Sequence, residues 1–309
     1  MKSGTTGGRD AGALLLIVPA GVLGVALAWV LTSPDVPGQA VIRVIADCAG
    51  ATVLGLAALP RLHERLLPPW RLLAALAGLW CVAEFAVLLL EAAEVVGVPV
   101  RRLGAEQFGT FLTEISAGQV GIAILLGTGA IAGYSALVFR RQEVTSTDLV
   151  LAFAAVALAL RPITGHMSQQ SFGSVLAAVH ALAAATWFGL LVALALVVRA
   201  RGEWATVLPR YSAVALPLIA VVALTGIVNG LVRVDGLGPL LSTGYGRILL
   251  AKALLLSVLL ALGWWWRRSW VRRAADHRVT AHASLRRAVI EVVVMAVAFG
   301  LAAALAVTA

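Results

Sequence analysis

The sequence predicts an all-α membrane protein, a polytopic transmembrane helix bundle of about nine spans. Of its 309 residues, 61% are hydrophobic and only 13% are charged, about half the charged fraction of a soluble domain. Apolar runs long enough to cross a bilayer recur along the chain, whereas a transmembrane β-barrel would show short segments of alternating hydrophobicity. We therefore expect the chain to lie in the lipid bilayer.

Nine apolar runs are expected to form the spans. They cover residues 11–32, 40–60, 70–92, 116–139, 146–162, 172–199, 211–234, 244–266 and 287–308. The fifth is the shortest, but without it the arginine-rich loops on either side would lie on opposite faces of the membrane. Residues 144–148 divide a four-helix N-terminal region, residues 1–145, from a five-helix C-terminal region, residues 146–309.

Arginines in alternate connections predict the orientation. They follow the second, fourth, sixth and eighth runs, and Lys2 and Arg9 precede the first. Basic loops stay in the cytoplasm, so the N-terminus is expected inside and the C-terminus outside. Topology therefore accounts for the net charge of +9, and we expect no nucleic-acid partner. Trp264–Trp266 and Trp270 are expected at the membrane interface.

The second and third runs carry polar groups in their outer halves. Arg43 and Asp47 are four residues apart, a spacing that suits an ion pair within one helix, and Cys48 follows Asp47. Cys81 and Glu84 share a face of the third run. The two cysteines are expected at similar depths on antiparallel helices, either as small core residues or as ligands.

The connection before the sixth run predicts a metal site at the external end. Pro162 and Gly165 interrupt the helix and would present His166 and Met167 outside. Imidazole accepts either oxidation state of copper, and the soft thioether favours Cu(I).

His180 lies inside the sixth run, about two turns below its external end. An ionisable side chain in the membrane is costly and marks a candidate functional site; a hydrogen bond between helices is the alternative explanation. Three other histidines, His63, His277 and His282, fall in basic cytoplasmic loops, where we expect them to be solvated.

The seventh and eighth runs add polar groups at a similar depth. Thr225, Asn229 and Arg233 are spaced four apart and form one stripe. Lys252 lies about two turns in from the outside on the face of Tyr245, although it could also extend to the external interface. The cytoplasmic half offers mainly Glu291, near the start of the last run.

Several ordered motifs resemble one known family. They are Gly-His at 165–166, H-x6-WFG from His180 to Gly189, and RYS, LTGIVNG, TGYGRILLAK and LRRAVIEV, which begin at Arg210, Leu224, Thr243 and Leu285. Over residues 164–309 the chain resembles the copper resistance protein D (CopD) family, bacterial inner-membrane proteins associated with copper uptake or tolerance. Residues 1–145 resemble its longer members only in general character.

The resemblance implies copper handling between the external compartment and the cytoplasm, often with a separate extracytoplasmic copper-binding protein, and no enzymatic activity. His166 and His180 match the family's histidine positions. The matches to its polar positions are Asn229, Tyr245, Arg247 and Lys252. Leu190 departs from the family pattern, because many relatives have WxGG where this chain has WFGL.

The leading hypothesis is therefore copper transport, in which copper passes from His166 and Met167 to His180. Asp47, Cys48, Cys81 and Glu84 are possible further ligands. The sequence has no phosphate-binding loop, so we expect gradients, or the delivery and capture of copper, to drive transport. A b-type haem protein that carries electrons is one alternative, and a membrane chaperone for assembly of a copper enzyme is another.

Overall fold

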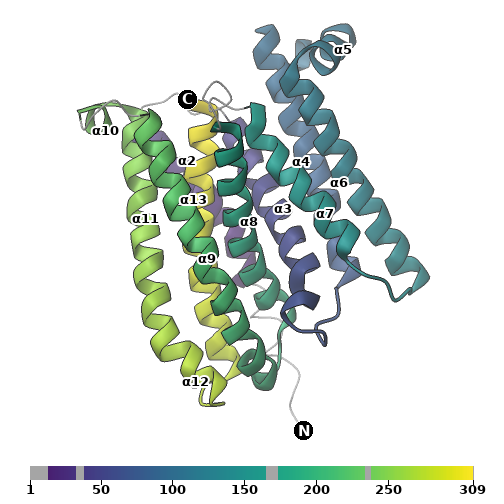
Figure 1. Cartoon of the computed structure of the whole chain (residues 1–309). Helices are drawn as coiled ribbons and strands as arrows, with labels where there is room; N and C mark the ends of the chain where they lie inside the picture. Colours follow the sequence, from purple (N-terminus) through teal and green to yellow (C-terminus); the bar gives the residue numbers. More distant parts are fainter. Residues whose placement is uncertain (1–12, 33–37, 165–172, 234–237, 309) are drawn as a thin grey trace.

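The computed structural model describes residues 13–32, 38–164, 173–233 and 238–308, and within these ranges it is a bundle of helices without strands (Figure 1). A helix lies on each of the nine predicted runs. These helices are α2 (Ile17–Thr32), α3 (Gln39–Leu62), α4 (Trp70–Val96), α6 (Ser116–Arg141), α7 (Asp148–Leu160), α8 (Gly173–Val197), α9 (Arg201–Arg233), α11 (Gly244–Trp266) and α13 (Ala281–Thr308). The all-α prediction is confirmed.

Seven of these helices are long and apolar enough to cross a membrane: α3, α4, α6, α8, α9, α11 with its continuation to Ala275, and α13. The other two are shorter, with 16 residues in α2 and 13 in α7. At 1.5 Å per residue, α7 covers about 20 Å of a hydrocarbon core about 30 Å thick. The expectation of nine spans is thus supported for seven helices and stays a prediction for α2 and α7.

Helix α9 begins ten residues before the predicted position, so Arg201 and Arg210 lie in a helix and not in a loop. Oε2 of Glu203 accepts hydrogen bonds from the backbone N–H groups of Arg199 and Ala200, at 2.9 and 3.0 Å. An acidic side chain there satisfies donors that the first turn leaves free. Nη1 of Arg210 donates to the carbonyl of Leu62, at 2.7 Å, and so caps α3.

Helix α13 also starts earlier than predicted. Oγ1 of Thr280 accepts from the backbone N–H of Ala283 at 3.2 Å, a typical N-cap.

Trp270 does not face the membrane interface as expected. It is only 1% exposed, and its Nε1 donates to Oγ of Ser284 at 3.1 Å. It lies in the π-helical segment η5 (Arg267–Val271), which joins α11 to α12 (Arg272–Ala275).

The centre of the bundle is formed by α3, α8 and α13, with α4 and α6 on one side and α9 and α11 on the other (Figure 1). Two glycines let α3 and α8 touch through their backbones. A Cβ on Gly55 would lie 2.0 Å from the carbonyl oxygen of Gly189, and a Cβ on Gly189 would lie 1.8 Å from that of Ala51. Small residues at a crossing permit such close packing in membranes. Leu190, beside the crossing, is buried.

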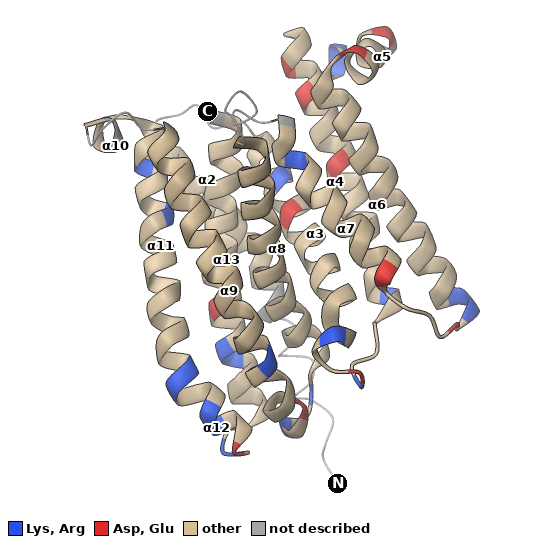
Figure 2. Ribbon diagram, in the orientation of Figure 1, with Lys and Arg blue, Asp and Glu red and all other residues tan. Residues whose placement is uncertain are grey.

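The two ends of the bundle differ in charge. Helices α5 (Ala105–Glu114) and α10 (Gly238–Ser242) lie at one end and α12 at the other, and we call these the α5 end and the α12 end. The arginine-rich connections lie at the α12 end, where lysine and arginine gather (Figure 2). A cytoplasmic α12 end would satisfy the positive-inside rule, and the orientation of the termini stays a prediction.

Candidate functional site

His180 projects from α8 toward α9, where a hydrogen bond holds its ring. Nδ1 of His180 lies 2.8 Å from Oγ1 of Thr225. The same hydroxyl donates its hydrogen to the carbonyl of Val221, at 2.6 Å. Because a hydroxyl has only one hydrogen, Oγ1 of Thr225 accepts from Nδ1–H of His180, and Nε2 of the ring keeps its lone pair.

The surroundings of the ring favour this tautomer. The carbonyl of Val222 lies 3.3 Å from Oγ1 of Thr225 and is near enough to the ring to interact with it. A Cβ on Gly226 would lie 3.5 Å from Cε1 of His180, so α9 presents its backbone to the imidazole. A histidine that binds a metal through one nitrogen usually donates its other N–H to an oxygen in this way.

Two further polar side chains belong to the same region. Asn229 lies one turn from Thr225 toward the α5 end of α9, and its Oδ1 is buried without a hydrogen-bond partner. Lys252 of α11 is half-buried and close enough to His180 for their charges to interact. His180 and Lys252 lie seven and eight residues from the ends of their helices, or about 10 and 12 Å. Both residues therefore lie about two turns inside their helices, as their spacing predicted, and their depth in the membrane stays a prediction.

Tyr245 and Arg247 lie in the first two turns of α11, nearer the α5 end than Lys252. Nε of Arg247 donates to the carbonyl of Thr243 at 3.3 Å, so Arg247 folds back on its own helix. Oγ1 of Thr243 caps the helix by accepting from the backbone N–H of Gly246, at 3.0 Å. The part of Tyr245 and Arg247 in a polar pathway remains a prediction.

His166 and Met167 lie outside the described residues. The chain on either side of them is held together, because Oγ of Ser174 donates to the carbonyl of Ile163 at 3.3 Å. The 3-10 helix η3 (Arg161–Thr164) and the start of α8 therefore meet at the α5 end, from which α8 leads down to His180.

A second polar cluster lies between α3, α4 and η3. Arg161 forms ion pairs with Glu84 and Glu91, the latter at 3.4 Å. Arg43 pairs with the same carboxylate at 3.7 Å. Asp47 is close enough to both arginines for the charges to interact. Two guanidinium groups thus face three carboxylates away from water, a costly arrangement that needs close pairing.

Arg161 was not predicted as a member of this cluster. Arg43 was expected to pair with Asp47 on its own helix, whereas the structure pairs it with Glu91 on α4. Nε1 of Trp80 donates to Glu84 at 3.0 Å, one turn away on the same helix. The position of Arg161 at the end of an apolar run could have indicated this role, because an arginine there can reach acidic side chains on neighbouring spans.

The two thiols are not brought together. Cys48 is buried in α3, and Sγ of Cys81 turns to α6, where it lies 3.9 Å from the carbonyl of Leu125. Both cysteines are free. Among the residues that the structure describes, no three side chains of His, Cys, Asp or Glu come close enough to hold a metal ion. The roles of Asp47, Cys48, Cys81 and Glu84 as ligands remain predictions.

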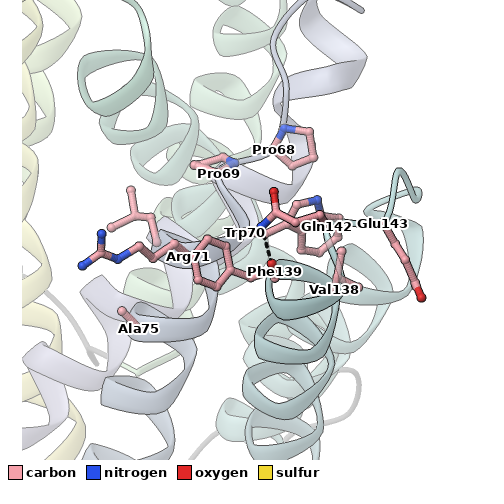
Figure 3. Close-up of a pocket in the computed structure, with 10 residues that line it drawn as sticks. Pro68, Pro69, Trp70, Arg71, Ala75, Val138, Phe139, Gln142 and Glu143 are labelled. Carbon is pink, nitrogen blue, oxygen red and sulfur yellow. Dashed lines mark hydrogen bonds between the residues drawn. The ribbon is translucent and has the colours of Figure 1, made fainter.

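A pocket of about 490 Å³ opens at the α12 end, between the start of α4 and the end of α6 (Figure 3). Its wall includes Trp70, Arg71, Phe139 and Glu143, and Nε2 of Gln142 donates to the carbonyl of Phe139 at 2.6 Å. His180 lies toward the opposite end of the bundle, so this pocket is not part of the candidate site.

Comparison with known proteins gives two matches to family models. The model described as copper resistance protein D matches residues 205–305, which contain Thr225, Asn229 and Lys252. The model described as copper resistance protein D-like, N-terminal domain, matches residues 33–173, which contain His166 and Met167. His180 falls between the two matched segments. No curated protein and no solved structure matches the chain.

Proposed function

Because the chain belongs to the copper resistance protein D family, we propose that it transports copper across a bacterial plasma membrane and so contributes to copper homeostasis. Its family and its seven long apolar helices make it a multi-pass membrane protein that handles copper. Both the N-terminal and the C-terminal parts match the family, which extends the resemblance beyond the motifs of residues 164–309.

The hydrogen bond between His180 and Thr225 is the observation that carries this proposal. It directs the proton of the ring to Nδ1 and leaves Nε2 available within the membrane. A neutral imidazole with one free nitrogen is the form that binds copper. Oδ1 of Asn229, which has no partner, offers an oxygen in the same region.

The charge of Lys252 favours a site that passes copper on over one that stores it. A positive charge near His180 repels a copper ion that arrives there, so the ion is held less tightly than the same ligands would hold it alone. Conduction needs sites that are occupied and then left. We therefore assign His180 to a transit step and not to a structural copper site.

The route begins outside the membrane. His166 and Met167 capture copper, delivered as an ion or by a separate extracytoplasmic copper-binding protein, and pass it to His180. Asp47, Cys48, Cys81 and Glu84 stay candidates for a polar path beside this route. Glu84 is the weakest of them, because Arg161 and Trp80 already occupy its carboxylate.

Copper accumulation at increasing external copper tests the route. His166→Ala should weaken capture at low copper and be partly rescued by more copper, because the later step is intact. His180→Ala should lower the maximal rate and resist rescue. His63→Ala is the matched control, since His63 lies at the end of α3, where its Nδ1 accepts from the backbone of Arg65 at 3.0 Å.

Indistinguishable curves for the two variants would contradict the serial route, and unchanged uptake in the double variant would contradict the copper site itself. Metal analysis and a visible spectrum of the purified protein separate the alternatives. Stoichiometric copper without a Soret band supports copper handling, whereas a Soret band would favour a haem protein. Copper binding without uptake would favour the chaperone.

A further inference from the structure

A third cluster of polar side chains lies in the half of the bundle nearer the α12 end. The proposed copper route does not use it. Trp187 of α8, Tyr211 of α9 and Glu291 of α13 are all buried, with 4%, 5% and 6% of their surface exposed. Each lies ten residues from the α12 end of its own helix, which places all three at a depth of about 15 Å.

The three side chains lie close to one another without completing their hydrogen bonds. Trp187 is near enough to interact with the carboxyl group of Glu291 and with the hydroxyl group of Tyr211, and the last two are near enough to influence each other. Even so, neither Nε1 of Trp187 nor Oη of Tyr211 has a hydrogen-bond partner of normal geometry. Nη1 of Arg287, one turn from Glu291 on α13, is also buried without a partner.

Two unpartnered groups beside one carboxyl group, Nε1 of Trp187 and Oη of Tyr211, are the kind of partners that a buried water takes. A water oxygen can accept from Trp187 and Tyr211 while its hydrogens reach Glu291. Buried waters typically make about three hydrogen bonds to polar groups that otherwise lack a partner. Arg287 lies between Glu291 and the α12 end, so polar groups continue from this position toward that end.

Glu291 is the group that can take up a proton here. Around it, α9 contributes Tyr211, its own helix contributes Arg287, and α8 contributes only the neutral indole of Trp187. The described part of α2 contains no titratable residue, and Arg43 and Asp47 of α3 and Arg247 and Lys252 of α11 lie nearer the α5 end. Two arginines lie nearer the α12 end, but Arg61 of α3 pairs with Asp148 and Arg210 of α9 donates to the carbonyl of Leu62. An intramembrane carboxyl group with polar neighbours is typical of a proton relay.

We propose that Glu291, Trp187 and Tyr211 form a water-holding proton site, and that its proton is exchanged when copper passes through the membrane. A hydronium ion gives its proton to the carboxylate, which leaves a carboxylic acid and a water molecule, and the reverse step releases the proton. The coupling to copper rests on the proposed function. Trp187 lies seven residues from His180 on the same face of α8, so a copper ion at His180 favours the ionised carboxylate.

Infrared difference spectra of the purified protein between acidic and alkaline pH test the proton site without copper. The wild type should show a carboxylic acid band that Glu291→Gln removes and that Tyr211→Phe shifts in frequency. Glu106→Gln, an exposed position in α5, should leave the band unchanged. A band that persists unchanged in Glu291→Gln and Tyr211→Phe would overturn the site.

Proteoliposomes that contain a pH-sensitive dye test the coupling. Copper added outside should drive a proton flux in the wild type that falls at least tenfold in Glu291→Gln, whereas Glu106→Gln should match the wild type. Copper uptake without a proton flux would overturn the coupling but leave the proposed transport intact. An absence of copper uptake by the wild type would overturn transport, and with it the coupling, while the infrared result would still decide the proton site.

Discussion

At the scale of single residues, the Thr225 hydroxyl decides which nitrogen of His180 is free. It accepts from Nδ1 because its own hydrogen is committed to Val221. A residue that orients a ligand in this way raises metal affinity without touching the metal. Thr225 is thus a positioning residue for the proposed copper site.

Thr225→Val should therefore weaken Cu(I) binding by about 10- to 100-fold, while Thr225→Ser, which keeps the hydroxyl, should stay near the wild type. The measurement is competition with a chromophoric Cu(I) chelator on the purified protein. Thr186→Val is the matched control, because that hydroxyl on α8 donates to the carbonyl of Leu182 at 2.7 Å. Equal affinities for Thr225→Val and the wild type would show that the hydrogen bond does not position the ligand.

Sequence spacing predicted part of this site. The stripe of Thr225 and Asn229 and the depth of His180 follow from helical periodicity, which needs only the sequence. Which member of the stripe meets His180 depends on the rotation of α9 against α8, which tertiary packing decides. Tyr211 was expected at the very start of a span, so its shared depth with Glu291 could not be predicted until α9 was seen to begin at Arg201.

At the scale of elements, the cluster between α3, α4 and η3 joins three segments through charge. Arg161 holds Glu84 and Glu91 from the far end of α7. Periodicity located the helices that carry these groups, but ion pairs between helices depend on which faces meet. An arginine at the end of a predicted span is compatible with both a solvated and a buried position.

Arg161→Gln should lower the stability of the protein by about 3–5 kcal/mol, because it leaves buried carboxylates without their partner. The side chains of Arg161 and Glu84 are only 13% and 6% exposed. Arg61→Gln is the matched control, since the Arg61–Asp148 pair is 48% and 68% exposed and exposed pairs contribute little to stability. Thermal unfolding in detergent measures both.

The double variant Arg161→Gln/Glu84→Gln should recover part of the loss, because it removes one of the unpaired charges. Equal losses for Arg161→Gln and Arg61→Gln would contradict a buried network.

At the scale of the whole molecule, the N-terminal helices pack into the rest of the bundle. Helix α3 crosses α8 at Gly55 and Gly189, and α2 crosses α13, where a Cβ on Gly24 would lie 2.2 Å from the carbonyl oxygen of Val297. Glycines in apolar runs are visible in the sequence, but their partners are not, because the pairs are far apart in the chain. The division into residues 1–145 and 146–309 therefore remains a prediction.

The orientation in the membrane is the last property that the charge pattern predicts. Two exposed residues at opposite ends can test it, Ser242 in α10 and Asp276 after α12. In a background with Cys48→Ala and Cys81→Ala, Ser242→Cys should react with an impermeant maleimide added to intact cells. Asp276→Cys should react only after the membrane is permeabilised, because the surrounding arginines keep its loop in the cytoplasm. Labelling of Asp276→Cys in intact cells would reverse the topology and would place His180 in the cytoplasmic half of the membrane.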